Sequence, residues 1–247
     1  MNIGLLGFGV VGGGVWELAQ ENRALNVKKV LVRREAPSLG KAAVQDVEAI
    51  LRDTEIDTVV EVLGGLHPAY EWICRALAAG KDVVTANKAV ISAYYRELTA
   101  LARENGVALR CTAAVGGGIP WLVNLQRCRR VDTVTEVGGI MNGTTNFIMD
   151  AMARQGADFP AVLQRAQELG YAEADPSADI DGDDIRRKLT ISANIAFDAL
   201  LREEDIPAFG IRTVTGADVA DFRAHGFTCK LLACAQRTET GVAAYVE

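Results

Sequence analysis

The chain opens with a short apolar run, residues 2–6, that leads at once into a glycine-rich turn and then a helical pattern. The turn, residues 7–12, reads GFGVVG, and glycines with this spacing between a strand and a helix are typical of dinucleotide-binding sites. Gly7 permits the tight turn, Gly9 lets the backbone approach a pyrophosphate, and Gly12 lets helix and strand pack closely. A purely structural turn is the alternative. We predict a dinucleotide site formed by Gly7, Gly9, Val10, Val11 and Gly12.

Apolar runs alternate with amphipathic stretches along the first 111 residues. This alternation is the rhythm of βαβ units and predicts a parallel sheet with helical crossovers. Three glycines and an Ile-Pro pair then interrupt the pattern at residues 115–120, where we place a domain boundary. We expect an α/β chain with a Rossmann-type NAD(P)-binding domain in residues 1–118 and an α+β catalytic and dimerisation domain in residues 119–247. The expected strands cover residues 2–6, 28–33, 57–62, 82–86 and 107–111.

Two arginines end the second expected strand. A site that prefers NAD usually presents an acid about 20 residues after the glycines, where it bonds the ribose 2′-hydroxyl. Here Arg33 and Arg34 stand in that region, and a guanidinium pairs bidentately with phosphate. We therefore expect Arg33 to contact the 2′-phosphate of NADP. NAD stays open, because Glu35 is close and the arginines could simply be solvated.

Two more loops follow the third and fourth expected strands, and they contain Gly64 and Lys88. Ligands bind at the carboxyl ends of parallel strands in open α/β sheets. We therefore assign Gly64 and Lys88 to the cofactor site and expect Lys88 to serve the nicotinamide or the substrate. A solvated lysine at a strand end is the alternative.

An acid-rich segment, residues 170–188, holds six carboxylates from Glu173 to Asp184 and then a lysine, Lys188. Such a concentration of negative charge favours a cationic ligand. Asp184 and Lys188 are four residues apart at the start of a helical pattern, so both side chains lie on one face. An ordinary exposed i,i+4 ion pair, worth about 0.3 to 0.5 kcal/mol, is the alternative. We favour a functional pair because of the surrounding acids.

The segment 142–146, Asn-Gly-Thr-Thr-Asn, comes between an expected strand and an expected helix. Asn142, Thr144 or Thr145 could cap that helix, and capping alone would explain these residue types. Exposed amides at a helix start also suit a carboxylate. We expect the backbone near Gly143 and Thr144 to receive the carboxylate of a substrate.

Several of these patterns, in this order along the chain, resemble one family. GFGVVG, TANKA, VGGGIP and MNGTTNF, followed by the acid-rich segment with its Asp-Pro, Asp-Ile, Gly, Asp and Lys positions, are similar to homoserine dehydrogenases. The resemblance covers nearly the whole chain. It implies reversible hydride transfer between NAD(P)H and L-aspartate 4-semialdehyde, which gives L-homoserine in the biosynthesis of threonine, methionine and isoleucine.

The resemblance also implies roles for particular residues. Lys188 is the expected proton donor, Lys88 is expected near the reacting carbonyl, and Gly170 is assigned to the cofactor. Acidic side chains are expected to bind the substrate ammonium. Backbone carbonyls of the glycine-rich loop, residues 115–120, are expected to bind a sodium ion. Thr112 stands where the family usually has a glutamate. The ammonium ligands are Glu173, Asp179 and Asp184, and the sodium positions are Thr112, Val115, Gly117 and Ile119.

The family's catalytic region continues past the position of Glu247, so we expect the chain to be truncated inside a hairpin and to lack a regulatory domain. Two alternatives stay open: a non-catalytic NADP-binding fragment, and a dehydrogenase of another small amino or hydroxy acid. Calorimetric NADP binding without homoserine oxidation would favour the first, and substrate screening would reveal the second.

Charge and hydropathy limit the partners. The chain has 26 basic and 32 acidic residues, a net charge of -6 and no basic stripe, which argues against nucleic acid. It has no apolar run of the roughly 18 to 20 residues that a membrane span needs. We expect a cytoplasmic protein with a small amino-acid substrate. The family resemblance suggests a homodimer formed through the second domain.

Overall fold

The computed structural model describes all residues from Met1 to Glu247, and they form two compact units, Met1–Trp121 and Leu122–Glu247. The division falls at the start of α5 (Trp121–Val131), just after the glycine-rich loop. The assignment of a cofactor role to residues 1–118 and a substrate role to residues 119–247 stays a prediction.

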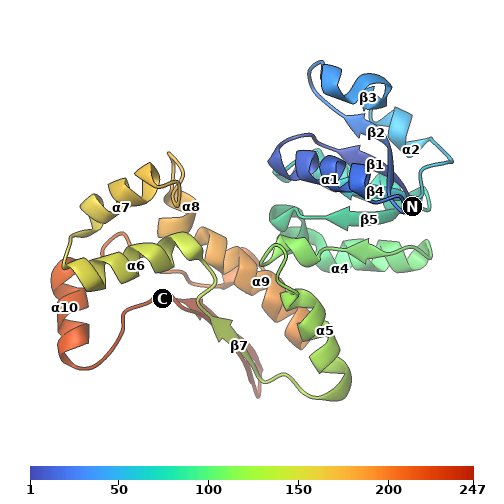
Figure 1. Cartoon of the computed structure of the whole chain (residues 1–247). Helices are drawn as coiled ribbons and strands as arrows, with labels where there is room; N and C mark the ends of the chain where they lie inside the picture. The colour runs from blue at the N-terminus through green and yellow to red at the C-terminus, as the bar shows by residue number, and fades with distance from the viewer. The chain divides into compact units, whose positions relative to one another are not determined.

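The first unit is built on a six-stranded parallel sheet with the strand order β3-β2-β1-β4-β5-β6, which confirms the expected Rossmann-type fold (Figure 1). Helices connect most of the consecutive strands. The elements in chain order are β1 (Asn2–Leu6), α1 (Val10–Glu21), β2 (Asn26–Leu31), a 3-10 helix η1 (Pro37–Ala42), β3 (Ala43–Val44), α2 (Glu48–Leu51), β4 (Thr58–Glu61), α3 (Ala69–Ala78), β5 (Asp82–Thr85), α4 (Lys88–Glu104), β6 (Leu109–Arg110) and a 3-10 helix η2 (Thr112–Ala114).

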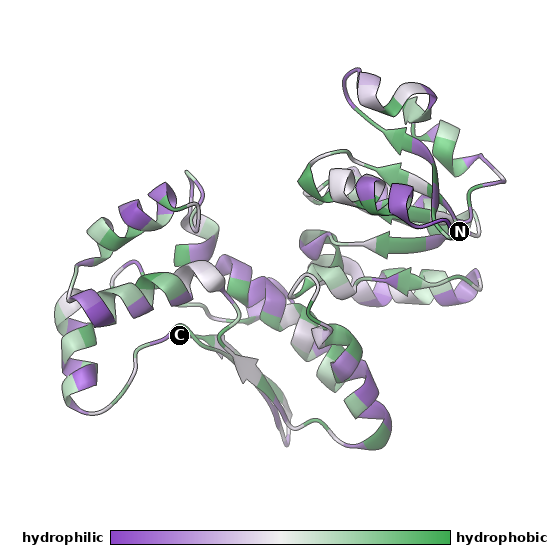
Figure 2. Ribbon diagram, viewed as in Figure 1, coloured by the Kyte–Doolittle hydropathy of each residue, from purple (hydrophilic) through white to green (hydrophobic).

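Both faces of this sheet are covered. Ile3 and Leu5 of β1 belong to a buried cluster against which Trp16 of α1 packs. Gly4, between them, faces the opposite side, where a Cβ atom would lie 2.3 Å from Cγ2 of Ile50 in α2. Strands buried on both faces read as continuous apolar runs, and Figure 2 shows much of this sheet in the hydrophobic colour.

The carboxyl ends of the four central strands are in register. Leu6 at the end of β1 pairs with Leu31 of β2 and with Glu61 of β4, and Glu61 pairs with Thr85 of β5. The glycine-rich turn and the loops that follow β4 and β5 therefore leave the sheet at the same edge. This is the edge at which ligands bind in open α/β sheets.

The second unit combines a three-stranded antiparallel sheet, in the order β7-β8-β9, with a group of helices, as expected of an α+β domain. The predicted hairpin near the end of the chain is formed by β8 and β9. After α5, the elements in chain order are β7 (Glu136–Gly139), α6 (Gly143–Gln155), α7 (Phe159–Glu168), α8 (Ser177–Ile180), α9 (Asp183–Phe197), a 3-10 helix η3 (Glu203–Asp205), α10 (Gly216–Ala224), β8 (Ala233–Thr238) and β9 (Gly241–Val246).

Helix α9 packs across all three strands of the small sheet. The face beneath it is made of small or β-branched residues that are almost completely buried, which lets the helix sit close to the strands; they include Val137, Ala233, Ala235 and Val246. The opposite face carries exposed residues at alternating positions of the same strands. In α9 itself, Ile185, Leu189 and Ala193 form the buried stripe predicted by their spacing.

The structure differs from the sequence-based expectation in a few places. β3, a strand of only two residues, was not predicted, and Arg33 lies two residues beyond β2 instead of at its end. β6 is also shorter than its apolar run. None of the helices combines the length and the apolar character that a membrane crossing requires.

Candidate active site

The three glycines of the first turn occupy three different environments. Gly7 has a φ of 106°, which favours glycine, and a Cβ at Gly12 would lie 2.2 Å from the carbonyl oxygen of Gly7. A Cβ at Gly9 would meet no protein atom within 4 Å. The turn and the close helix contact thus need Gly7 and Gly12, whereas Gly9 borders open space. These are the features that a pyrophosphate cradle requires.

Helix α1 begins within this segment, at Val10, directly after Gly9. Its first turn contains no acidic residue, and no side chain caps the helix start. The first amides of a helix have no partner within the helix, and they carry the positive end of its dipole. Val10 is 96% exposed. The exposed amides at the start of α1 are therefore suited to bind the phosphates of a dinucleotide.

Arg33 and Arg34 are both exposed after β2, and neither forms an ion pair. Glu35, which could have blunted their charge, makes no salt bridge with them. The two guanidinium groups remain available to an anion at the carboxyl edge of the sheet.

Sequence reasoning missed the role of Glu61. This carboxylate is fully buried at the end of β4, and it accepts hydrogen bonds from the Thr85 hydroxyl (2.6 Å) and from the backbone amide of Leu63 (2.8 Å). Asn87 donates its side-chain amide to Glu61 (3.3 Å) and to the carbonyl of Gly65 (2.7 Å). These bonds tie together the loops that follow β4 and β5. An acid inside the apolar run 57–62 was the signal in the sequence.

Lys88 is the first residue of α4, and Asn87 caps this helix by accepting a hydrogen bond from the amide of Val90 (3.3 Å). The backbone position of Lys88 is therefore fixed by the Glu61 network. Gly64, with a φ of 75°, lies in the adjacent loop. Their contacts with a cofactor stay predictions.

The loop proposed to hold sodium begins in η2. The carbonyl of Thr112 accepts a hydrogen bond from the amide of Val115 (3.4 Å), and that of Ile119 accepts one from Trp121 (2.7 Å). Gly117 has a φ of 57°, so the chain reverses sharply here. A carbonyl oxygen has two lone pairs, so these bonds leave each able to contact a cation.

In the second unit, Lys188 and Asp184 lie one turn apart in α9 with 2.7 Å between Nζ and Oδ2. Their side chains are only 18% and 16% exposed. Nζ of Lys188 also donates a hydrogen bond to the carbonyl of Met141, at 2.7 Å. The ammonium group is thus held between a carboxylate and a backbone oxygen from a different segment.

Asn142 completes this arrangement. Its side-chain amide donates hydrogen bonds to Asp179 (2.7 Å) and to Asp184 (2.9 Å). Its side-chain oxygen caps α6 through the amide of Thr145 (2.9 Å), as the sequence suggested. The structure therefore brings together three of the predicted residues, Asp179, Asp184 and Lys188.

The other predicted substrate residues lie at the edges of this group. Glu173 and Gly143 are exposed, and the Thr144 hydroxyl donates a hydrogen bond to the carbonyl of Tyr171 (2.8 Å). Gly170, with a φ of 77°, follows α7. The side chain of Glu173 makes no hydrogen bond or ion pair with the Asp184 and Lys188 pair, so its role stays a prediction.

The acid-rich segment is not one uniform cluster. Arg212 forms two hydrogen bonds with Asp181, at 2.8 and 2.7 Å, and Arg186 forms one with Asp183 at 2.6 Å. The Arg212 guanidinium lowers the pKa of Asp181. These two acids are thus neutralised locally, and the inference that the whole cluster needs a cationic ligand was too broad.

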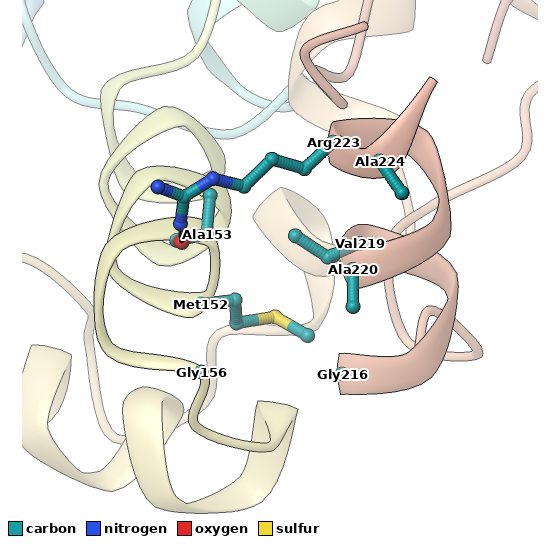
Figure 3. A pocket seen from close by; sticks show the side chains of 8 residues that line it. All are labelled: Met152, Ala153, Gly156, Gly216, Val219, Ala220, Arg223 and Ala224. Carbon is teal, nitrogen blue, oxygen red and sulfur yellow. Dashed lines mark hydrogen bonds between the residues drawn. The ribbon is translucent and has the colours of Figure 1, made fainter. Parts of the chain in front are cut away.

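A pocket of about 430 Å³ lies between α6 and α10 (Figure 3). Small and apolar side chains line it, and Arg223 closes one side by donating to the carbonyl of Ala153 (3.0 Å). None of the predicted substrate residues lines this pocket. We do not assign the substrate to it.

A glycine cradle on a parallel sheet, together with a largely buried Asp-Lys pair on an α+β unit, fits the class of two-domain dinucleotide-dependent dehydrogenases. Family models agree with this class. Residues 7–112 match "Homoserine dehydrogenase, NAD binding domain" and residues 120–247 match "Homoserine dehydrogenase". The chain belongs to the homoserine dehydrogenase family.

Individual relatives support this assignment. The chain is 44% identical to a homoserine dehydrogenase from Synechocystis, over 95% of this chain and 57% of that protein, and 40% identical to one from Pseudomonas aeruginosa, over 98% and 58%. A crystal structure of a homoserine dehydrogenase from Thiobacillus denitrificans superposes with a TM-score of 0.93 at 40% identity, over 100% of this chain and 60% of that one. The chain thus spans a little over half the length of these relatives.

A hyperthermophilic archaeal homoserine dehydrogenase, solved in complex with NADPH, superposes with a TM-score of 0.81 at 25% identity. The match covers 100% of this chain and 80% of that one.

Proposed function

We propose that this chain carries the active site for the reversible reduction of L-aspartate 4-semialdehyde to L-homoserine by a nicotinamide cofactor. The observation that carries the proposal is the partly buried pair of Asp184 and Lys188, whose Nζ and Oδ2 atoms lie 2.7 Å apart. Membership of the homoserine dehydrogenase family supports the same reaction.

Lys188 supplies the proton. Bound NADPH would supply the hydride to the aldehyde carbon. Negative charge then grows on the carbonyl oxygen, and a nearby ammonium both stabilises it and transfers a proton to it, which gives the hydroxyl of homoserine. Asp184 and the carbonyl of Met141 hold Nζ of Lys188 in one direction, so little reorganisation is needed when the charge develops. The lysine then regains a proton from water.

The charged groups of the substrate fit the surrounding residues. The carboxylates of Asp179 and Asp184 lie on one side of Asn142, where they can receive the substrate ammonium, and we assign Glu173 to the same group. The amides of Gly143 and Thr144 belong to the first turn of α6, so they can receive the substrate carboxylate.

We assign NADP as the preferred cofactor, and NAD as the less favoured one. The glycine turn, residues 7–12, receives the phosphates, and the exposed guanidinium of Arg33 suits a 2′-phosphate. The archaeal relative solved with NADPH supports a phosphorylated cofactor. Gly64, Lys88 and Gly170 complete the proposed cofactor contacts, and Lys88 also serves the reacting carbonyl.

We further propose that carbonyls of the loop after β6 hold a sodium ion. The positions are those of Thr112, Val115, Gly117 and Ile119. Backbone carbonyls are suitable ligands for a hard cation, and Gly117 lies in a turn with a φ of 57°. Activity in sodium buffers above that in tetramethylammonium buffers of equal ionic strength would support this.

The proposed homodimer would use the face of the small sheet that α9 leaves uncovered. Tyr245 and Cys234 are paired neighbours on this face, next to Ala243 and Gln236. An isologous contact between two copies would bury these side chains. Light scattering should give the mass of a dimer, and Tyr245→Lys should shift it towards the monomer.

We place the protein in the cytoplasm.

The test is a spectrophotometric assay of NADPH formation from homoserine and NADP. It is run on the 247-residue chain and on a version extended beyond Glu247 with the matching segment of the Synechocystis relative. We expect homoserine to react, and 4-hydroxybutanoate, which lacks the ammonium, to react at least about 100-fold more slowly, since it leaves the acidic groups unpaired. NADP binding without oxidation of homoserine by either chain would contradict the proposed function.

A further inference from the structure

Asn142 makes more contacts than a helix cap requires. The residue is only 6% exposed, and its side chain bridges α6 to two other helices. The side-chain oxygen accepts hydrogen bonds from the amide and the hydroxyl of Thr145, at 2.9 and 3.1 Å. The side-chain nitrogen donates to Asp179 on α8 and to Asp184 on α9. One amide group thus caps a helix and joins two carboxylates.

The chemistry of these partners fixes the orientation of the amide. The backbone N–H of Thr145 can only donate, so it must face the side-chain oxygen of Asn142. The NH2 group then faces the two carboxylates, and each of its protons has one acceptor. A cap alone needs only the oxygen, as Ser and Asp caps show. The NH2 group is therefore free to serve another purpose.

Asp184 shares one oxygen between two donors. Its Oδ2 atom lies 2.7 Å from Nζ of Lys188 and 2.9 Å from the amide nitrogen of Asn142. The amide also reduces the repulsion between Asp179 and Asp184, because it places a donor between two like charges. Asn142 thus holds Asp179 close to Asp184, the acid that pairs with Lys188.

We propose that Asn142 is a positioning residue that holds the carboxylates of Asp179 and Asp184 in the geometry that grips an ammonium and directs Lys188. The assignment rests on the proposed function, because these acids and this lysine are its substrate and proton-transfer groups. The role needs no contact between Asn142 and the cofactor or the reacting atoms. It acts through its two carboxylate partners.

Three side chains with similar capping ability separate the two roles. Asn, Ser and Asp are comparable helix caps. Ser removes the NH2 group, and Asp replaces it with an oxygen, which brings a third carboxylate next to Asp179 and Asp184. Capping alone predicts the same activity for all three proteins. Positioning predicts that kcat/KM for homoserine falls in the order Asn, Ser, Asp, with Asn142→Ser reduced about 10-fold or more by the lost hydrogen bonds to charged groups.

The controls use groups outside the site. NADP affinity, measured by calorimetry, should stay within about twofold in both variants, because Asn142 is not one of the proposed cofactor contacts and its hydrogen-bond partners are Thr145, Asp179 and Asp184. Thr215→Ser is the matched capping control, since Thr215 caps α10 through the amide of Asp218. It should keep wild-type kinetics. Equal kcat/KM values for Asn142, Asn142→Ser and Asn142→Asp would overturn the proposal.

The thermal unfolding midpoints of the two variants test the positioning role independently of activity. In Asn142→Asp the new carboxylate faces Asp179 from α8 and Asp184 from α9, with Lys188 as the nearby cation and Lys230, bonded to Asn146, one turn along α6. At neutral pH its unfolding midpoint should lie about 3 °C or more below that of Asn142→Ser, and the gap should close below about pH 4 as carboxylates become neutral.

The two measurements separate the possible failures. If neither the 247-residue chain nor its extended version oxidises homoserine, the proposed function fails, while the thermal comparison still tests whether the amide lies between two charged carboxylates. Equal midpoints of the Ser and Asp variants at neutral pH would overturn the positioning role even in an active enzyme.

Discussion

Nζ of Lys188 and Oδ2 of Asp184 lie 2.7 Å apart on one face of α9, and less than a fifth of either side chain is exposed. An exposed i,i+4 pair of this kind contributes only about 0.3 to 0.5 kcal/mol. Burial makes the pair more costly to form, and a second acceptor, the carbonyl of Met141, fixes the ammonium. The sequence spacing alone predicts a salt bridge, whereas the structure adds the burial and the fixed direction of Nζ on which the proposed proton transfer depends.

Asp184→Asn should retain the fold and lose most of the activity. The amide is nearly isosteric with the carboxylate, but it removes the charge that holds Lys188 and that we propose receives the substrate ammonium. We expect kcat/KM for homoserine to fall about 100-fold or more. Asp183→Asn is the matched control, because Asp183 is more exposed and pairs with Arg186. Similar kinetics in the two variants would argue against a special role for Asp184.

The first glycine turn allows a set of three alanine substitutions. Gly12→Ala places a Cβ 2.2 Å from a backbone oxygen and should destabilise the protein by about 1 to 3 kcal/mol. Gly9→Ala meets no protein atom, so it should keep the stability but weaken NADP binding by intruding on the pyrophosphate. A Cβ at Gly13, in α1, would also meet no protein atom within 4 Å. Gly13→Ala should therefore leave NADP binding unchanged and raise the free energy of unfolding by about 0.5 to 1 kcal/mol. Denaturant unfolding measures the change in stability, and calorimetry measures the change in NADP binding.

Arg33→Ala should change the choice of cofactor. If the exposed guanidinium pairs with the 2′-phosphate, its loss should raise the Kd of NADP about 10-fold or more and leave the Kd of NAD nearly unchanged. Lys41→Ala, another exposed cation of the first unit, serves as the control. Equal weakening of both cofactors would show that Arg33 does not read the phosphate.

The ion pair of Asp181 and Arg212 should make stability depend on pH in the acid range. The Arg212 guanidinium lowers the pKa of Asp181 in the folded protein. Stability from this pair is therefore present above the unfolded pKa of about 3.9 and is lost as the pH falls through the lower folded value. Arg212→Ala should lower the unfolding midpoint at neutral pH, and its difference from the wild type should shrink below about pH 4. A constant difference down to pH 3 would contradict this role.

The parallel sheet could be predicted because its strands are buried on both faces and are separated by helices. These features leave continuous apolar runs and periodic stretches in the sequence. β3 was not predicted because a strand of two residues, Ala43 and Val44, is too short to show an alternating pattern. It forms by pairing with β2, which is a tertiary effect.

The site could be predicted only where its contacts are local. Asp184 and Lys188 are one turn apart, so helical periodicity places them together. The bonds from Asn142 to Asp179 and Asp184 join residues 37 and 42 positions apart, and no local pattern encodes them. The same limit applies to the pairing of Asp181 with Arg212, 31 positions away.

The turnover of Lys188→Ala with homoserine and NADP, compared with the wild type at the same pH, is the most direct test of the proposed proton transfer. The substitution removes the ammonium and leaves the buried stripe of α9 intact. We predict that kcat falls about 100- to 10,000-fold, while the Kd of NADP stays within about twofold. A kcat close to that of the wild type would contradict the assignment of Lys188 as the proton donor.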